Sequence, residues 1–106
     1  MFTAYASKVE RMTTTGFSDT GSPIKTKTTI HNSVVLDISE QKQEVIQSES
    51  GMDVVVDTRI TCPLGTDIKA DDIITNLVDG VRYKVVSVIK RTLLNYLEIK
   101  GQKGVL

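Results

Sequence analysis

The fold is decided by the stretch IKTKTTIHNSVVL, residues Ile24 to Leu36. Its even-numbered positions are mostly apolar or threonine, whereas several odd-numbered positions carry lysine, histidine or serine. A repeat of two is that of a β-strand, in which successive side chains point to opposite faces. Between Thr26 and Val35 many residues are β-branched, and such residues favour strands. The stretch therefore predicts a long strand with one apolar and one polar face.

The same alternation returns from Met52 to Cys62. The even-numbered positions there are apolar except for Thr58, and the odd-numbered positions include two aspartates and an arginine. Pro63 and Gly65 follow directly, and a proline cannot donate a hydrogen bond to a strand ladder. This pattern predicts a second strand that ends at Cys62.

Two further strands are predicted at Val81–Ile89 and Tyr96–Lys100. Asp79-Gly80 precedes the first of them between β-prone flanks, which is a strong signal for a two-residue hairpin turn. Apolar residues change phase between Val85 and Val86, so a β-bulge is expected there.

The chain of 106 residues predicts one domain, residues 1–106. Short strands separated by turn signals predict a mainly β fold, a small antiparallel β-barrel or a sandwich. Val9, Arg11 and Thr13 suggest a first strand, and the segment 16–23 is a turn-rich loop. The tail 101–106 is expected to be flexible. The residues expected to face the core are Ile30, Val34, Val54, Val56, Ile60 and Ile99.

One polar segment, residues 38–51, interrupts the β pattern. It is rich in helix-forming residues, and Asp37 with Glu40 has the spacing of a capping box. Either a short helix or an exposed loop fits, and a connection of this length is typical of a functional segment. The residues of this insert are Ile38, Ser39, Glu40, Gln41, Lys42, Gln43, Glu44, Val45, Ile46, Gln47, Ser48, Glu49, Ser50 and Gly51.

Composition argues against several classes of function. Thirteen basic and thirteen acidic residues give no net charge, whereas a duplex-DNA binder usually has a basic excess. No apolar run approaches the roughly 20 residues of a membrane helix, and the N-terminus lacks the features of a signal peptide. The only cysteine, Cys62, cannot form a disulfide within the chain. With one histidine, His31, as the only other soft ligand, a structural zinc site is not expected.

No group of residues predicts catalysis, and the protein is expected not to be an enzyme and to need no metal or cofactor. His31 is expected at the surface and Cys62 in the core, because neither has the neighbours that a catalytic group needs. Asp71, Asp72 and Asp79 are acidic but have the sequence context of turns. Lys25 and Lys27 with His31 form a weak basic stripe without interleaved aromatic residues, which argues against single-strand binding.

Taken in order, these features resemble the head-completion (stopper) proteins of long-tailed bacteriophages. The similarity runs from about Val34 to Gly101 and consists of several short motifs in a fixed order, whereas the first thirty residues match poorly. The motifs are Leu36-Asp37-Ile38-Ser39, the polar insert with Gln47, Thr61-Cys62-Pro63, the Asp79-Gly80 hairpin with Tyr83-Lys84-Val85, and Leu97-Glu98-Ile99-Lys100-Gly101.

The resemblance implies a virion protein of the head-to-tail connector, assembled in the cytoplasm of the host bacterium. Its partners would be portal and adaptor proteins, a tail-completion protein and further copies of itself in a ring. The ring would close the portal channel, retain packaged DNA without sequence-specific binding, and offer a docking surface to the tail. The segment 38–51 would be the channel plug, with Ile38, Ser39 and Gln47 at the matching positions, and its three glutamates would repel phosphates.

Two other functions remain open at this stage. A tail-completion or head-to-tail joining protein has similar size and β content but needs no plug, so the long insert favours the stopper. An oligonucleotide-binding barrel should gather aromatic residues on one strand face. The three tyrosines, Tyr5, Tyr83 and Tyr96, are scattered along the sequence.

Overall fold

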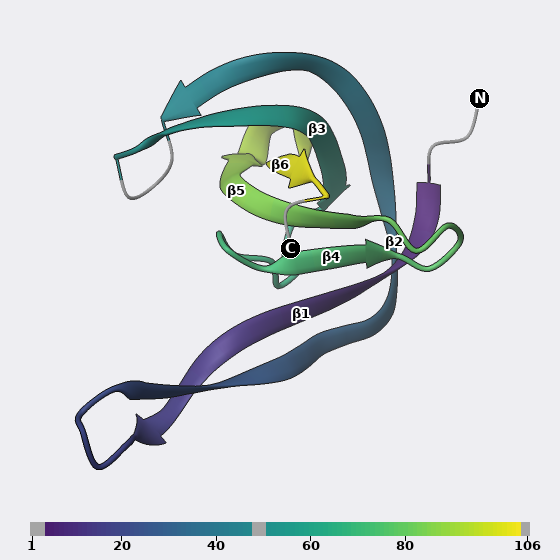
Figure 1. Cartoon of the computed structure of the whole chain (residues 1–106). Helices are drawn as coiled ribbons and strands as arrows, with labels where there is room; N and C mark the ends of the chain where they lie inside the picture. Colours follow the sequence, from purple (N-terminus) through teal and green to yellow (C-terminus); the bar gives the residue numbers. More distant parts are fainter. Residues whose placement is uncertain (1–3, 48–50, 105–106) are drawn as a thin grey trace.

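The computed structural model describes residues 4–47 and 51–104, and these fold into one six-stranded antiparallel sheet that closes into a barrel. Around the barrel the strands follow the order β1-β2-β3-β6-β5-β4 (Figure 1). The strands are β1 (Ala4–Phe17), β2 (Pro23–Gln47), β3 (Asp53–Pro63), β4 (Ile73–Asn76), β5 (Arg82–Arg91) and β6 (Tyr96–Lys103), and a 3-10 turn, η1 (Thr92–Leu94), joins the last two. The predicted mainly β fold is confirmed, and closure of the sheet decides for a barrel over a sandwich.

Strand β2 has 25 residues and connects the two projecting parts of the molecule. Its first part pairs with β1, from Phe17↔Pro23 to Ala4↔Asp37, and its last part pairs with β3, from Asp37↔Thr61 to Gln47↔Asp53. In Figure 1 the strand leaves the β1–β2 turn, curves around one side of the barrel and returns above it. Both ends of β2 therefore project from the barrel as two-stranded hairpins.

The prediction that residues 38–51 form a loop or a short helix is wrong. Residues 38–47 continue β2, Ser48–Ser50 lie outside the described residues, and Gly51 stands in a bend with φ of +87°. Helix propensity is a weak preference that a partner strand overrides, and β3 supplies this partner. Because this part of the hairpin projects beyond the barrel, many of its side chains meet water, and its sequence lacks the one-sided apolar pattern of a core strand.

A bulge separates the barrel part of β2 from its projecting end. Glu40 pairs with Thr58 and Glu44 pairs with Val56, so Gln41, Lys42 and Gln43 stand opposite Asp57 alone. Extra residues on one strand bend it and increase its twist. The hairpin is therefore expected to bend at Gln41–Gln43, the most polar part of residues 38–47.

The core fills the barrel at the middle of the strands. The buried cluster consists of Val9, Leu36, Ile38, Ile60, Cys62, Ile68, Ile74, Tyr83, Val85, Leu97 and Ile99. Of the predicted core residues, Val56, Ile60 and Ile99 are buried, and Ile30 and Val34 pack partly buried against the cluster. The assignment of Val54 to the core is wrong, because this residue is only half-buried and belongs to the projecting part of β3.

Two turn predictions near the C-terminus also need correction. The connection between β4 and β5 is the five-residue loop 77–81 rather than a two-residue turn, although Gly80 does take a positive φ of 75°. The segment 101–103 is not a flexible tail but the end of β6, paired with β3 and β5. A Cβ at Gly101 would lie 3.2 Å from the Lys84 carbonyl oxygen, so this glycine permits a close strand approach. The predicted bulge beside Val85 is present, between Val85 and Ser87.

Candidate functional site

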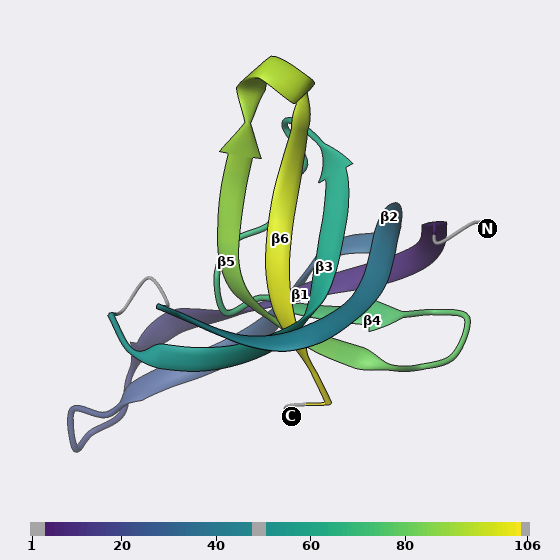
Figure 2. The same cartoon turned by 90° about the horizontal axis from the view of Figure 1, so that it is seen from above.

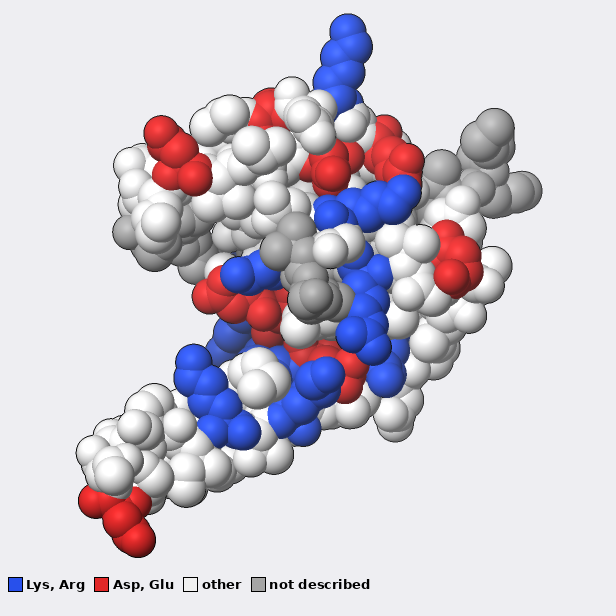
Figure 3. Space-filling view, viewed as in Figure 1, with Lys and Arg blue, Asp and Glu red and all other residues white. Residues whose placement is uncertain are grey.

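Two hairpins project from the barrel and are the candidate sites of contact with other molecules. We call the first the β1–β2 arm, residues 11–29, and the second the β2–β3 arm, residues 41–47 with 51–57. Figure 3 shows the outline of the molecule hollowed between two projections, with acidic and basic side chains at the floor of the hollow. Neither arm contributes a residue to the buried cluster of the core, so each is free to contact another molecule.

The structure divides the predicted plug residues into two groups. Ile38 is buried in the core and Ser39 is half-buried beside it, so these two residues belong to the barrel. The residues from Glu40 to Gln47 are exposed except for the half-buried Ile46. The predicted insert therefore begins within the barrel, and its exposed part continues from Glu40 into the β2–β3 arm.

Apolar side chains are exposed on the β2–β3 arm. Val45 and Val55 are directly opposite each other, and Val45 is 66% exposed. Met52 at the start of β3 is also exposed. An isolated two-stranded ribbon gains nothing from exposed valines, and contiguous exposed apolar side chains are typical of contact sites.

Two ion pairs join the base of the β2–β3 arm to β6. The Lys100 ammonium lies 2.9 Å from Oε1 of Glu44, and the Lys103 ammonium pairs with Glu40. The hydrogen bond to Glu40 raises the pKa of Lys103 above its ordinary value. The expected repulsion of phosphates by the three glutamates of the insert is weakened, because Glu40 and Glu44 are each neutralised by a lysine.

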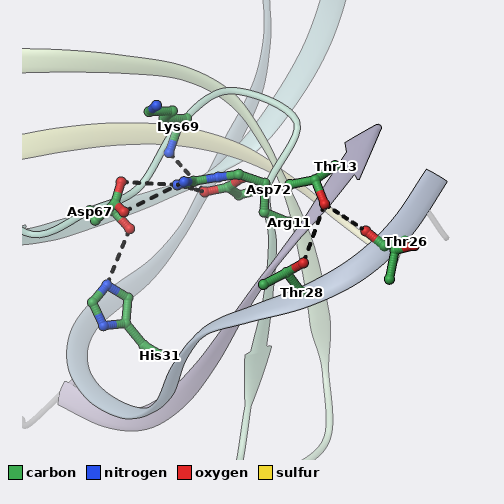
Figure 4. Close-up of polar contacts among 8 residues, drawn as sticks. All are labelled: Arg11, Thr13, Thr26, Thr28, His31, Asp67, Lys69 and Asp72. Carbon is green, nitrogen blue, oxygen red and sulfur yellow. Dashed lines mark hydrogen bonds and ion pairs between the residues drawn. The ribbon is translucent and has the colours of Figure 1, made fainter. Parts of the chain in front are cut away.

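The β1–β2 arm has a threonine face. The Thr13 hydroxyl donates to the Thr26 carbonyl oxygen at 3.2 Å and lies 3.3 Å from the Thr28 hydroxyl (Figure 4), and Thr15 and Thr26 share a similar contact. Cross-strand threonine pairs of this kind stabilise a ribbon that has no core beneath it. Phe17 at the end of β1 is 71% exposed, so this arm also carries an apolar tip.

A buried ion pair fixes the base of the β1–β2 arm. Arg11 donates from Nε and Nη2 to the two carboxylate oxygens of Asp72, both at 2.8 Å, and Asp72 is only 1% exposed (Figure 4). Nη2 also donates to Asp67 at 3.1 Å, and the Lys69 backbone N–H donates to Asp72 at 2.8 Å. The hydrogen bond to Asp72 raises the pKa of Arg11, and the hydrogen bond from Arg11 lowers the pKa of Asp67.

The loop 64–72 is thus tied to both strands of the arm. Arg11 holds it from β1, and the His31 ring nitrogen Nε2 lies 3.2 Å from the Asp67 carbonyl oxygen on the β2 side. Sequence reasoning missed Arg11 and interpreted Asp72 as a turn residue. The available signal was that Arg11 continues the inward phase of Ser7 and Val9, where a charged residue requires a buried partner.

The remaining candidates do not assemble into a chemical site. Asp71 lies 3.7 Å from the Lys84 ammonium, and Asp79 caps the Val81 backbone N–H at 2.9 Å in its own turn. Within residues 4–47 and 51–104, no group of three His, Cys, Asp or Glu side chains could hold a metal ion. Burial raises the pKa of the Cys62 thiol, which is a property of a structural cysteine.

Of the tyrosines, Tyr5 and Tyr83 line one cavity, and Tyr96 lines another with Arg59, Thr61 and Cys62. No strand face carries a row of aromatic residues among the residues described, so a base-stacking platform is not built here. In the same part of the chain, none of the helical structure is long and apolar enough to span a bilayer.

Comparison with known proteins gives a relationship at the level of the fold. No family model matches the sequence, and no curated protein matches it. A solved structure, the phage-like element PBSX protein xkdH from Bacillus subtilis, superposes with a TM-score of 0.67 over 98% of this chain and 96% of that chain. The two sequences are 16% identical, so the similarity establishes a shared fold.

Proposed function

We propose that the chain is a structural protein of a phage or prophage head-to-tail connector that forms a ring and closes the portal channel with the β2–β3 arm. The single observation that carries this proposal is the fold shared end to end with a protein of a phage-like element. The motifs of the stopper family between Val34 and Gly101 support the same assignment.

The distribution of exposed apolar side chains supports an assembly role. Eight of them lie at or near the ends of hairpins, namely Phe17 and Ile24, Val45 and Met52, Leu77 and Val78, and Leu93 and Leu94, whereas Met12, Val35 and Val55 lie along strands. Side chains in such positions add nothing to the core of a single copy. In a ring, where each copy has neighbours on two sides, several hairpins are buried at once.

The geometry of the β2–β3 arm suits a plug better than a loop would. A paired hairpin keeps its shape when it projects, because the strand ladder satisfies its backbone groups. The base of the arm combines the bulge at Gln41–Gln43 and the exposed ion pairs of Glu40 and Glu44 with one buried apolar side chain, Val56. An arm joined in this way can be held by neighbours in the ring and can swing when these contacts change. A tail-completion protein requires no such arm.

Shortening the β2–β3 arm tests the proposal. A variant in which Val45 is followed by an Asn-Gly turn and then by Val55 removes residues 46–54 and keeps the Val45↔Val55 pair. The barrel is expected to fold, because the removed residues contribute nothing to the core cluster. Particles assembled with this variant are expected to package DNA and to lose it before tails attach.

The other arm offers a matched control. Joining Thr13 to Thr26 by an Asn-Gly turn shortens the β1–β2 arm at an equivalent pair and leaves the proposed plug intact. Particles with this control are expected to retain DNA. If particles with the shortened β2–β3 arm retain their genomes as well as the unmodified particles do, this arm is not the plug.

A further inference from the structure

The turn between β5 and β6 is an exposed apolar tip. Leu93 is 100% exposed and Leu94 is 67% exposed, and both lie in the 3-10 turn η1. Asn95 ends the turn in the left-handed conformation with φ of 60°, and its N–H donates to the Thr92 carbonyl oxygen. The turn lies beyond the end of β3, which pairs with β6 as far as Tyr96 (Figure 2). The two leucines are therefore presented at the outer end of the β5–β6 hairpin.

A small cavity lies at the other end of the barrel. It has a volume of about 200 Å³ and is lined by Tyr5, Ile38, Ser39, Glu40, Asn76, Asp79 and Tyr83. Pockets for small-molecule ligands are typically larger, roughly 300–1,000 Å³. The cavity has the size for a single side chain. Its exposed lining is more polar than apolar, because Ile38 and Tyr83 are almost completely buried.

Tip and cavity cannot meet within one copy. Tyr83 stands at the beginning of β5 and the tip follows its last residue, Arg91. Ten extended residues span roughly 30 Å at about 3.3 Å per residue. A contact between the two features requires a second molecule.

The charges around the two features are complementary. Lys90 and Arg91 flank the leucines, and Glu98 neutralises one of them at 3.1 Å from Arg91, which leaves the tip with a net positive charge. Glu40 and Asp79 line the cavity, and Lys103 neutralises Glu40, which leaves the rim with a net negative charge. Complementary potentials orient two copies during an encounter and fix the register of their contact.

We propose that the η1 tip of one copy docks at the Tyr5–Tyr83 cavity of the next copy, with Leu93 against the cavity and Lys90 facing Asp79. This inference rests on the proposed ring, and it names the contact between neighbouring subunits. The two surfaces differ, so the contact is heterologous, and heterologous contacts generate rings when the rotation between copies closes.

Disulfide trapping between two full-length variants tests the contact. One carries Leu93→Cys at the tip and the other carries Ser39→Cys in the cavity wall. Circular dichroism verifies that each is folded. When they are mixed at high concentration under oxidising conditions, a mixed dimer is expected to form several-fold faster than with a Thr20→Cys control at the exposed end of the β1–β2 arm. Cys62 does not compete, because it is buried and its raised pKa keeps it protonated.

A charge variant adds a second readout. Lys90→Glu placed in the Leu93→Cys copy is expected to slow the trapping several-fold at low salt and to reverse its dependence on salt, because the net charge of the tip changes sign. Trapping no faster than with the Thr20→Cys control overturns the proposed contact, even if the chain still enters particles and retains DNA. DNA retention by particles tests the proposed function, whereas trapping between two purified variants tests the subunit contact. Each result can therefore fail without the other.

Discussion

The two arms of this protein are built on the same strand but are joined to the barrel in opposite ways. The β1–β2 arm is held by Arg11, whose guanidinium makes two 2.8 Å hydrogen bonds with a carboxylate that is almost completely buried. The β2–β3 arm is held by lysines whose glutamate partners, Glu44 and Glu40, have side chains 52% and 61% exposed. The carboxylate of Asp72 is thus buried at the first junction, whereas both carboxylates of the second junction are more than half exposed.

This difference predicts which arm moves more readily. Breaking a buried ion pair leaves an uncompensated charge in a medium of low dielectric, whereas breaking an exposed pair lets water replace the partner. We therefore expect the β1–β2 arm to be the more firmly held of the two. The weaker ion pairs at the base of the β2–β3 arm agree with the movable plug that we propose.

The largest effect is expected for Arg11→Ala. The variant leaves Asp72 buried without its cation, which typically costs about 3–5 kcal/mol of unfolding free energy. Urea denaturation followed by circular dichroism measures the loss. Lys8→Ala on the same strand is the control, because Lys8 forms an exposed pair with Glu10 and such pairs contribute at most about 1 kcal/mol. Equal urea midpoints for the two variants would mean that the Arg11–Asp72 pair does not fix the arm.

A smaller effect is expected for Lys100→Ala, which removes the partner of Glu44. The unfolding free energy should fall by at most about 1 kcal/mol, because the pair is partly exposed and is screened by salt. Hydrogen exchange is the more sensitive measurement, and the amides of Val45 and Val55 should exchange faster while those of Thr13 and Thr26 remain unchanged. Protection of the β2–β3 arm that survives both this substitution and high salt would contradict a weakly held junction.

The smallest effect concerns pH. The hydrogen bond from Arg11 lowers the pKa of Asp67, so the folded state holds the ionised carboxylate better than the unfolded state does. Asp67 therefore adds stability above its unfolded pKa, and this contribution is lost as the pH falls through the lower folded value, below about pH 4. Thermal unfolding between pH 2 and pH 5, roughly the range in which carboxylates titrate, should show a shallower acid dependence for Asp67→Asn than for the unmodified chain. An identical slope would remove Asp67 from the anchor of the β1–β2 arm.

Sequence patterning was most informative where one face of a strand meets the core. The alternation around Val56 and Ile60, and around Val34 and Leu36, placed these side chains correctly because burial of one face imposes a period of two. For the same reason, the shift of apolar residues from odd to even positions at Val85 and Val86 correctly predicted a β-bulge. Residues 40–47 are mostly exposed, but their backbone was assigned wrongly, since they form a strand. Their role as a channel plug stays a prediction.

The sequence by itself determined the mainly β class, which faces of the central strands meet the core, and the absence of an apolar face on residues 40–47. Only the tertiary structure decided that these residues are a strand, because a ribbon exposed on both faces has no periodic signal and its pairing depends on the distant β3. The tertiary structure also decided the partner of Arg11, which lies 61 residues away at Asp72. A local pattern records whether a side chain meets water or the core, and the identity of its partner depends on the path of the whole chain.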